Sequence, residues 1–233
     1  MRPQHLPRCT LTIRPVAFIL LQELYEGNYY LSGIASIFFD VGGVLLTNAW
    51  DHAERAQALA RFKVDLKEFQ PLHQDVVEKF ECGEITLDQY LERAIFFRPR
   101  TFSPEQFKSC MFSLSQALAG RLELAKGLAK SGKLFMGTIN NESRELNAYR
   151  IQTFGLRQLF SVFVSSCYVG LRKPNESIYR CALELTQRVP EECCFIDDRE
   201  ENLVPAAKLG MRVIQARSTE QIKKDLAGMG VTW

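Results

Sequence analysis

The strongest constraint on the fold is an alternation of short apolar runs with helical patterns through the second half of the chain. Strand-like runs occupy residues 133–138, 161–165, 193–196 and 211–215, and helical periodicity fills the stretches between them. This alternation is typical of parallel strands joined by right-handed helical crossovers, with helices on both faces of the sheet. With one more strand at residues 34–40, we predict an α/β fold with a Rossmann-like, five-stranded parallel sheet.

The segment between the first and second predicted strands is far longer than one crossover needs. It contains four helical patterns, at residues 52–62, 66–80, 87–97 and 104–119. Ser103 and Pro104 supply an N-cap and first-turn pair for the last of them, and Gly83 and Thr86 a helix stop and a new start. We therefore predict a helical cap at residues 49–117, inserted into a core of residues 34–48 and 118–233. Because ligands of α/β sheets bind at the carboxyl ends of the strands, this cap is placed to act as a lid.

The charge and cysteine content exclude several classes of protein. Net charge is only +2 over 233 residues, with Lys and Arg spread along the chain, so we expect a small-molecule partner, no nucleic acid and no membrane. Seven Cys without a CxxC spacing favour a reducing, cytoplasmic location over a disulfide framework or a zinc site. The three His share no ligand spacing. Nothing in the sequence indicates an oligomeric state.

The first 33 residues stand apart from this pattern. Residues 16–21 are apolar and follow Arg2, Arg8 and Arg14, as in a signal peptide. The run is too short for a membrane span, and no clear small-residue cleavage site follows it. We expect residues 1–33 to be a poorly ordered N-terminal extension.

Polar residues follow or precede the predicted elements of the core in a consistent order. Taken singly, each has an ordinary alternative as a turn residue, a helix cap, a surface lysine or a solvated acidic turn. Because the carboxyl ends of parallel strands share one edge of the sheet, we expect these residues to meet there. They are Asp40, Thr138, Lys173 and the pair Asp197 and Asp198.

This set supplies the groups that phosphoryl transfer requires, namely a nucleophile, a cation and fixed donors. Asp40 would attack phosphorus and form an aspartyl-phosphate, which divides hydrolysis into two easier steps. Asp197, Asp198 and Asp40 offer the oxygen ligands that Mg²⁺ prefers, and Lys173 would offset negative charge. The Thr138 hydroxyl, with backbone N–H groups at the start of the next helix, would bind phosphate.

From residue 34 to near residue 230, the chain resembles the haloacid dehalogenase-like (HAD) superfamily of hydrolases, in particular the subgroup with a small helical cap. The segment 40–44 is similar to the first family motif, Thr138 to the second, Lys173 to the third, and Asp197 with Asp198 to the fourth. The subgroup includes phosphatases of sugar phosphates.

The resemblance also implies roles for individual residues. It implies catalysis by Asp40 and Lys173, and phosphate binding by Thr138, Ile139 and Lys173. The Mg²⁺ ligands that it implies are Asp40, the backbone carbonyl of Gly42, Asp197 and Asp198.

One departure from the family pattern lies at Gly42. Family phosphatases usually carry there a second Asp, which protonates the leaving oxygen and later activates water. General acid–base help contributes about 10²–10⁴-fold, so we expect slower turnover, a good leaving group such as a sugar 1-phosphate, or a surrogate acid. His52 is a candidate for the surrogate acid, and its alternative interpretation is an ordinary residue in the first turn of a helix. Trp50 and Arg55 are candidates for lining the cap entrance.

We predict an Mg²⁺-dependent phosphatase that hydrolyses a small phosphorylated metabolite of the sugar phosphate type through Asp40. One alternative is a haloacid dehalogenase-type hydrolase, which also lacks the second Asp but needs no Mg²⁺. Another is a phosphate-ligand binding protein that has lost turnover.

Overall fold

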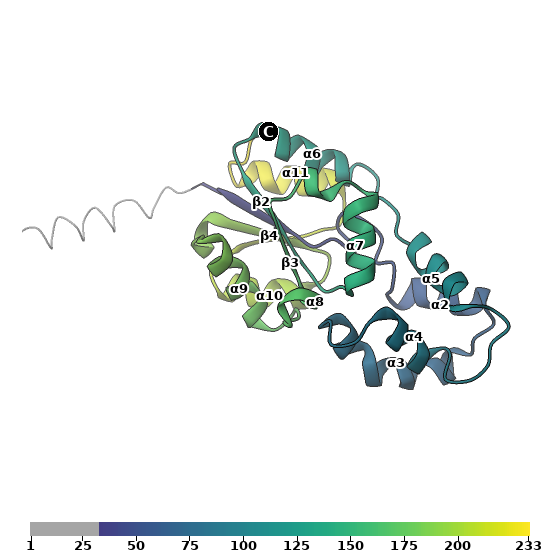
Figure 1. The fold of residues 1–233 in the computed structure, drawn as a ribbon. Helices are drawn as coiled ribbons and strands as arrows, with labels where there is room; N and C mark the ends of the chain where they lie inside the picture. The colour runs from purple at the N-terminus through teal and green to yellow at the C-terminus, as the bar shows by residue number, and fades with distance from the viewer. Residues whose placement is uncertain (1–32) are drawn as a thin grey trace, which may run out of the picture. The chain divides into compact units, whose positions relative to one another are not determined.

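The computed structural model describes residues 33–233, so the predicted extension lies outside the described residues except for Gly33. The core is a five-stranded sheet in the order β3-β2-β1-β4-β5. All strand pairs are parallel, and β1 lies in the centre between β2 and β4. Figure 1 shows the sheet between α6 and α11 on one side and α9 and α10 on the other. The predicted fold class is therefore confirmed. The strands are β1 (Ser36–Phe39), β2 (Phe135–Asn140), β3 (Val162–Ser165), β4 (Cys193–Asp197) and β5 (Arg212–Gln215).

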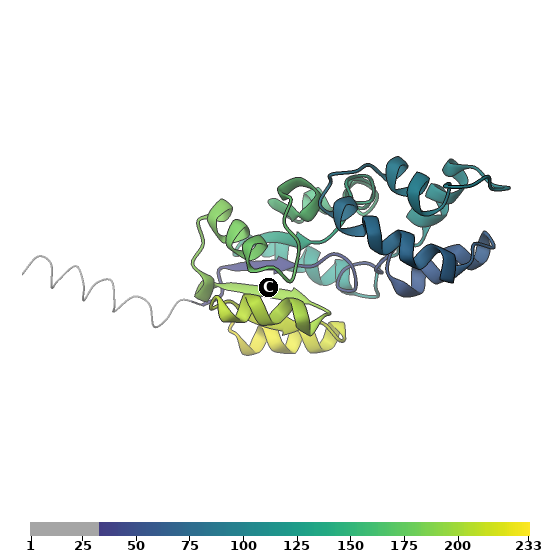
Figure 2. The same cartoon turned by 90° about the horizontal axis from the view of Figure 1, so that it is seen from below.

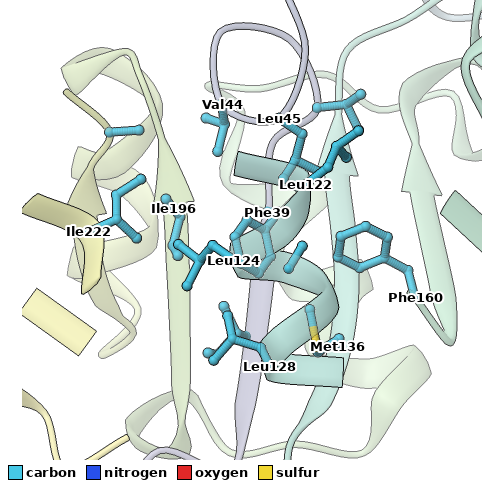
Figure 3. Close-up of a cluster of buried hydrophobic side chains, with 14 of the residues drawn as sticks. Phe39, Val44, Leu45, Leu122, Leu124, Leu128, Met136, Phe160, Ile196 and Ile222 are labelled. Atoms are coloured by element: carbon cyan, nitrogen blue, oxygen red, sulfur yellow. The ribbon is translucent and has the colours of Figure 1, made fainter. Parts of the chain in front are cut away.

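Helices cover both faces of the sheet, because successive residues of a strand point to opposite sides. Ile37 and Phe39 pack against α6 and α11, whereas Phe38 between them packs against α9 and α10. Figure 3 shows Phe39 of the first cluster beside Leu124 of α6. The helices outside the insertion are α6 (Arg121–Ser131), α7 (Arg144–Thr153), α8 (Ser166–Val169), α9 (Glu176–Thr186), α10 (Glu200–Lys208) and α11 (Thr219–Gly228).

A helical insertion follows β1 and lies beyond the carboxyl ends of the strands (Figure 2). Its helices share a buried aromatic cluster that includes Trp50, Tyr90 and Phe107. The predicted helix starts are confirmed, since Thr86 and Ser103 both form capping boxes. The four helices are α2 (His52–Arg61), α3 (Leu66–Glu81), α4 (Leu87–Ala94) and α5 (Pro104–Ser113).

Helix α5 ends six residues before its predicted end at residue 119, because the chain that follows pairs with the chain that enters the insertion. The Thr47 hydroxyl donates to the Leu114 carbonyl (2.6 Å) and accepts from Gln116 N–H (2.9 Å). The Leu118 N–H donates to the Leu45 carbonyl (3.0 Å). The two connections between the insertion and the core therefore run side by side. Helix α4 likewise ends at Ala94, three residues before its predicted end.

Strand β2 is displaced by two residues from the predicted run at residues 133–138. Gly137 lies inside the strand and does not end it. An added Cβ would approach the Phe38 ring to 2.9 Å, so glycine is needed here for the packing of the sheet. Thr138 pairs in register with Phe39, and the strand continues to Asn140. The residues that leave the carboxyl end of β2 are therefore Asn141 and those after it.

No helix within residues 33–233 is long and apolar enough to cross a membrane.

Candidate active site

Three carboxylates gather at the carboxyl ends of the two neighbouring strands β1 and β4. Phe39 pairs with Ile196, and the Asp40 N–H donates to the Ile196 carbonyl (2.8 Å), so Asp40 and Asp197 leave the sheet at the same level. Carboxylate oxygens of Asp40, Asp197 and Asp198 lie within 4.8 Å of one another. The structure thus brings these three predicted residues together.

Lys173 lies between two of these carboxylates. Its Nζ is 2.9 Å from Asp40 Oδ1 and 2.7 Å from Asp197 Oδ2, and the side chain is 1% exposed. Burial lowers the pKa of Lys173, but Asp40 and Asp197 more than offset this, so the pKa lies above its usual value and the amine stays charged. Asn141 fixes the lysine backbone, because it donates to the Lys173 carbonyl (2.9 Å) and accepts from its N–H (2.8 Å).

The Asp40 carboxylate has one oxygen that the protein holds and one that it leaves open. Oδ1 accepts from Lys173 and from the Val41 N–H (2.8 Å), whereas Oδ2 accepts no hydrogen bond from the described residues. Burial raises the pKa of Asp40, and the Lys173 cation opposes this shift. Oδ2 is therefore the oxygen that is available to a phosphorus atom or a cation.

Asp197 and Asp198 differ in how many of their carboxylate oxygens accept hydrogen bonds from the protein. Both oxygens of Asp197 are occupied by hydrogen bonds from Lys173, Asn202 and the Arg199 N–H. Asp198 Oδ1 is buried and has no hydrogen-bond partner among residues 33–233. A buried carboxylate oxygen of this kind is costly unless a cation compensates it. The cluster of three carboxylates fits Mg²⁺, and Asp198 offers the cation an open oxygen.

Gly43 allows Asp198 to approach the turn after β1. Its φ is +71°, and an added Cβ would lie 2.2 Å from Asp198 Oδ2. Real Cβ atoms do not approach other non-bonded atoms this closely, so a side chain at residue 43 would displace the Asp198 carboxylate. The turn therefore needs glycine both for its backbone conformation and for the space that Asp198 occupies.

We expect Gly43→Ala to weaken the cation site as well as the fold. The left-handed backbone costs about 1–3 kcal/mol, and displacement of Asp198 should raise the Mg²⁺ concentration for half-maximal binding by about 10–100-fold. Urea unfolding and calorimetric Mg²⁺ titration measure the two effects. Gly132→Ala is the matched control, because Gly132 has a φ of +65° and no atom within 4 Å of an added Cβ. Equal Mg²⁺ affinity in the two variants would contradict this role of Gly43.

A cavity of about 120 Å³ lies beside the carboxylates, between the sheet edge and the insertion. Asp40, Gly42 and Lys173 line it from the core, and Trp50 and Arg55 line it from the insertion. Trp50 packs in the buried aromatic cluster and donates to Tyr90 Oη (2.9 Å), while Arg55 donates to the Trp50 carbonyl (2.6 Å). His52 does not line the cavity, and its Nδ1 lies 3.3 Å from Arg55 Nη2.

The structure does not bring Thr138 or Ile139 to the cavity. Both are fully buried inside β2, and Ile139 packs against the face of the sheet that α9 and α10 cover. The lining residues after β2 are Asn141, Glu142 and Ser143. The sequence predicted phosphate binding by backbone N–H groups at this helix start, but it did not indicate Glu142, because the end of the strand was placed two residues too early.

Charged residues of the core and of the helical insertion surround the cavity, and few of them were predicted from the sequence. Arg172 pairs with Glu81 at the end of α3 (2.6 Å), and Arg199 pairs with Asp51 at the start of α2. All four line the cavity. The two ion pairs therefore link the insertion to the core at the cavity.

The chain belongs to the haloacid dehalogenase-like hydrolase family, which residues 34–210 match. The bifunctional epoxide hydrolase 2 of Rattus norvegicus is 31% identical over 208 residues, covering 81% of this chain and 37% of that protein. The flavin mononucleotide hydrolase 1 of Arabidopsis thaliana is 30% identical over 167 residues, covering 68% of this chain and 64% of that protein. The chain thus spans little more than a third of the epoxide hydrolases that it matches.

Solved structures share the fold. An HAD family enzyme of Bacteroides thetaiotaomicron, in complex with magnesium and inorganic phosphate, superposes with a TM-score of 0.66 at 22% identity, over 80% of this chain and 96% of that chain.

Proposed function

We propose that this protein is an Mg²⁺-dependent phosphatase that hydrolyses small phosphate esters, with Asp40 as the nucleophile. The observation that carries the proposal is the buried arrangement of Lys173 between Asp40 and Asp197, with an open oxygen on Asp40 and another on Asp198. One oxygen is then free to attack phosphorus while the lysine and the cation limit the charge. The similarity to a flavin mononucleotide hydrolase supports a phosphate ester as substrate.

In the first step, Asp40 Oδ2 attacks phosphorus, the bond to the leaving oxygen breaks, and an aspartyl-phosphate forms. In the second, water attacks the same phosphorus and the carboxylate is regenerated. Lys173 holds the nucleophile through Oδ1 and offsets charge near the phosphoryl oxygens. Bound Mg²⁺ would be held by Asp198 and the Gly42 carbonyl beside Asp40, and it would supply further neutralisation of those oxygens. Donors at the start of α7, after Asn141, replace Thr138 and Ile139 as the proposed phosphate contacts.

We further propose that residues 49–117 form a cap that selects the substrate. The buried aromatic cluster that their helices share and the ion pairs that they form at the cavity support this division. The proposed substrate is of the sugar 1-phosphate type, because an anomeric oxygen departs readily and needs less help from an acid. The six cysteines among residues 33–233 are free, which supports a cytoplasmic location.

Phosphate release from an aryl phosphate, glucose 1-phosphate and an alkyl phosphate, with Mg²⁺ and with EDTA, tests the proposal. We expect release that requires Mg²⁺ and is fastest for the better leaving groups. Metal-independent release of halide from a 2-chloro acid, without phosphatase activity, would support the dehalogenase alternative. Phosphate binding without hydrolysis of any ester would support the binding-protein alternative.

A further inference from the structure

A buried ion pair beside Gly42 is the feature that the proposed mechanism leaves unused. Arg150 Nη1 donates to Glu142 Oε2 (2.8 Å), and the two side chains are 3% and 9% exposed. Arg150 is held by two further hydrogen bonds, to Ser115 Oγ (3.1 Å) and to the Thr47 carbonyl. Glu142 and Arg150 both line the cavity that contains Asp40.

This pair stands next to the place where a side chain of residue 42 would project. An added Cβ on Gly42 would lie 2.8 Å from Asn48 Oδ1 and 3.5 Å from Arg150 Nη1. The same guanidinium nitrogen contacts the Glu142 carboxylate, so a single atom separates that carboxylate from the missing side chain. An acidic side chain at residue 42 would therefore meet Asn48 and Arg150. The carboxylate of Glu142 lies beside that position.

The surroundings of Glu142 make proton exchange near neutral pH accessible. Burial raises its pKa to about 7, although Arg150 and the Ser143 N–H favour the ionised form. Glu81 on α3 and Asp40 at the end of β1 face it with like charge and raise the pKa further. A group with a pKa near the working pH is the most effective general acid and base. His52, the surrogate considered from sequence, does not line the cavity.

We propose that Glu142, held by Arg150, is the proton-transfer group that replaces the acid missing at Gly42. The proposal rests on the phosphatase function proposed above. When the ester bond breaks, neutral Glu142 gives its proton to the leaving oxygen, directly or through one water, and becomes a carboxylate. When water then attacks the aspartyl-phosphate, this carboxylate takes a proton from the water. Phosphate and the Asp40 carboxylate are released, and Glu142 is neutral again.

Glu142→Gln tests the proposal, because an amide oxygen can still accept from Arg150 but the side chain cannot exchange the proton. For an alkyl phosphate we expect kcat to fall by about 10²–10⁴-fold. For an aryl phosphate, whose leaving oxygen needs no proton, the first step should survive while the second is slow. Rapid mixing should then show a burst of one equivalent of aryl alcohol per active site, followed by slow turnover. Glu123→Gln, the same carboxyl-to-amide change at a side chain of α6 that is 69% exposed and outside the cavity lining, should behave as the wild type.

Wild-type turnover of the alkyl phosphate by Glu142→Gln would overturn the proposal. Equal losses on both esters without a burst would also overturn it, since they indicate general damage to the site. If the wild-type protein hydrolyses neither ester, the phosphatase function itself fails, and the assignment of Glu142 fails with it.

Discussion

Replacing Asp40 with asparagine is expected to lower the turnover of every phosphate ester by at least about 10⁴-fold, as loss of a covalent nucleophile does in other hydrolases. The amide keeps the size of the side chain, but it cannot form the aspartyl-phosphate. Acid quenching of the wild type with a radiolabelled ester should trap phosphate on the protein, and the variant should trap none. Because burial raises the pKa of Asp40, the ionised carboxylate is unfavourable in the folded state, so the variant should be at least as stable as the wild type.

Asp88→Asn is the matched control for this substitution. Asp88 lies on α4 with a side chain that is 72% exposed, where it pairs with Lys108. The same loss of charge there should leave turnover and labelling unchanged. A labelled Asp40→Asn protein would place the nucleophile elsewhere.

Replacing Lys173 with methionine is expected to have the largest effect on stability. Methionine fills a similar volume but leaves two carboxylates without their shared cation, one of them fully buried. Removal of one partner from a buried ion pair costs about 3–5 kcal/mol. Urea unfolding at pH 8 without Mg²⁺ should show a loss of this size, together with loss of phosphatase activity.

The loss in the free energy of unfolding of Lys173→Met should be smaller at lower pH. Without Lys173, which opposes the effect of burial, the pKa of Asp40 in the folded protein rises further above its unfolded value. The folded variant then binds more protons than the unfolded chain, so its deficit should shrink as the pH is lowered from 8 towards 5. Lys133→Met, at an exposed lysine that contacts Thr232, should change the free energy of unfolding by less than about 0.5 kcal/mol. Equal effects of the two substitutions would contradict the role of Lys173.

The sheet and its helices were predictable because hydrophobic periodicity determines them locally. The position of Asp40 beside Asp197 followed from the same pattern, since parallel strands place their carboxyl ends together. The end of β2 was not predictable in this way. Gly137 resembles a strand end in the sequence. A glycine is needed inside the strand because Phe38 of β1 and Val162 of β3, which are adjacent to it only in the sheet, occupy the space of a side chain.

The same limit explains the misplaced phosphate contacts and the missed ion pair. An error of two residues at the end of β2 directed attention to Thr138 and away from Glu142. The partner of Glu142 is Arg150, which reads as an ordinary polar residue of α7 in the sequence. Its hydrogen bonds to Thr47 and Ser115 come from segments far away along the chain, so no local pattern indicates that it is buried.

The central place of β1 in the sheet has a consequence for synthesis on the ribosome. Ile37 pairs with Met136 on one side and Cys194 on the other, so the strand that is made early has both of its partners far downstream. At translation rates of about 5–20 residues per second, β4 emerges roughly 10–30 s after β1. During that interval, Ile37, Phe38 and Phe39 form an apolar segment with unpaired backbone edges, which is the kind of segment that chaperones bind and that aggregates in their absence.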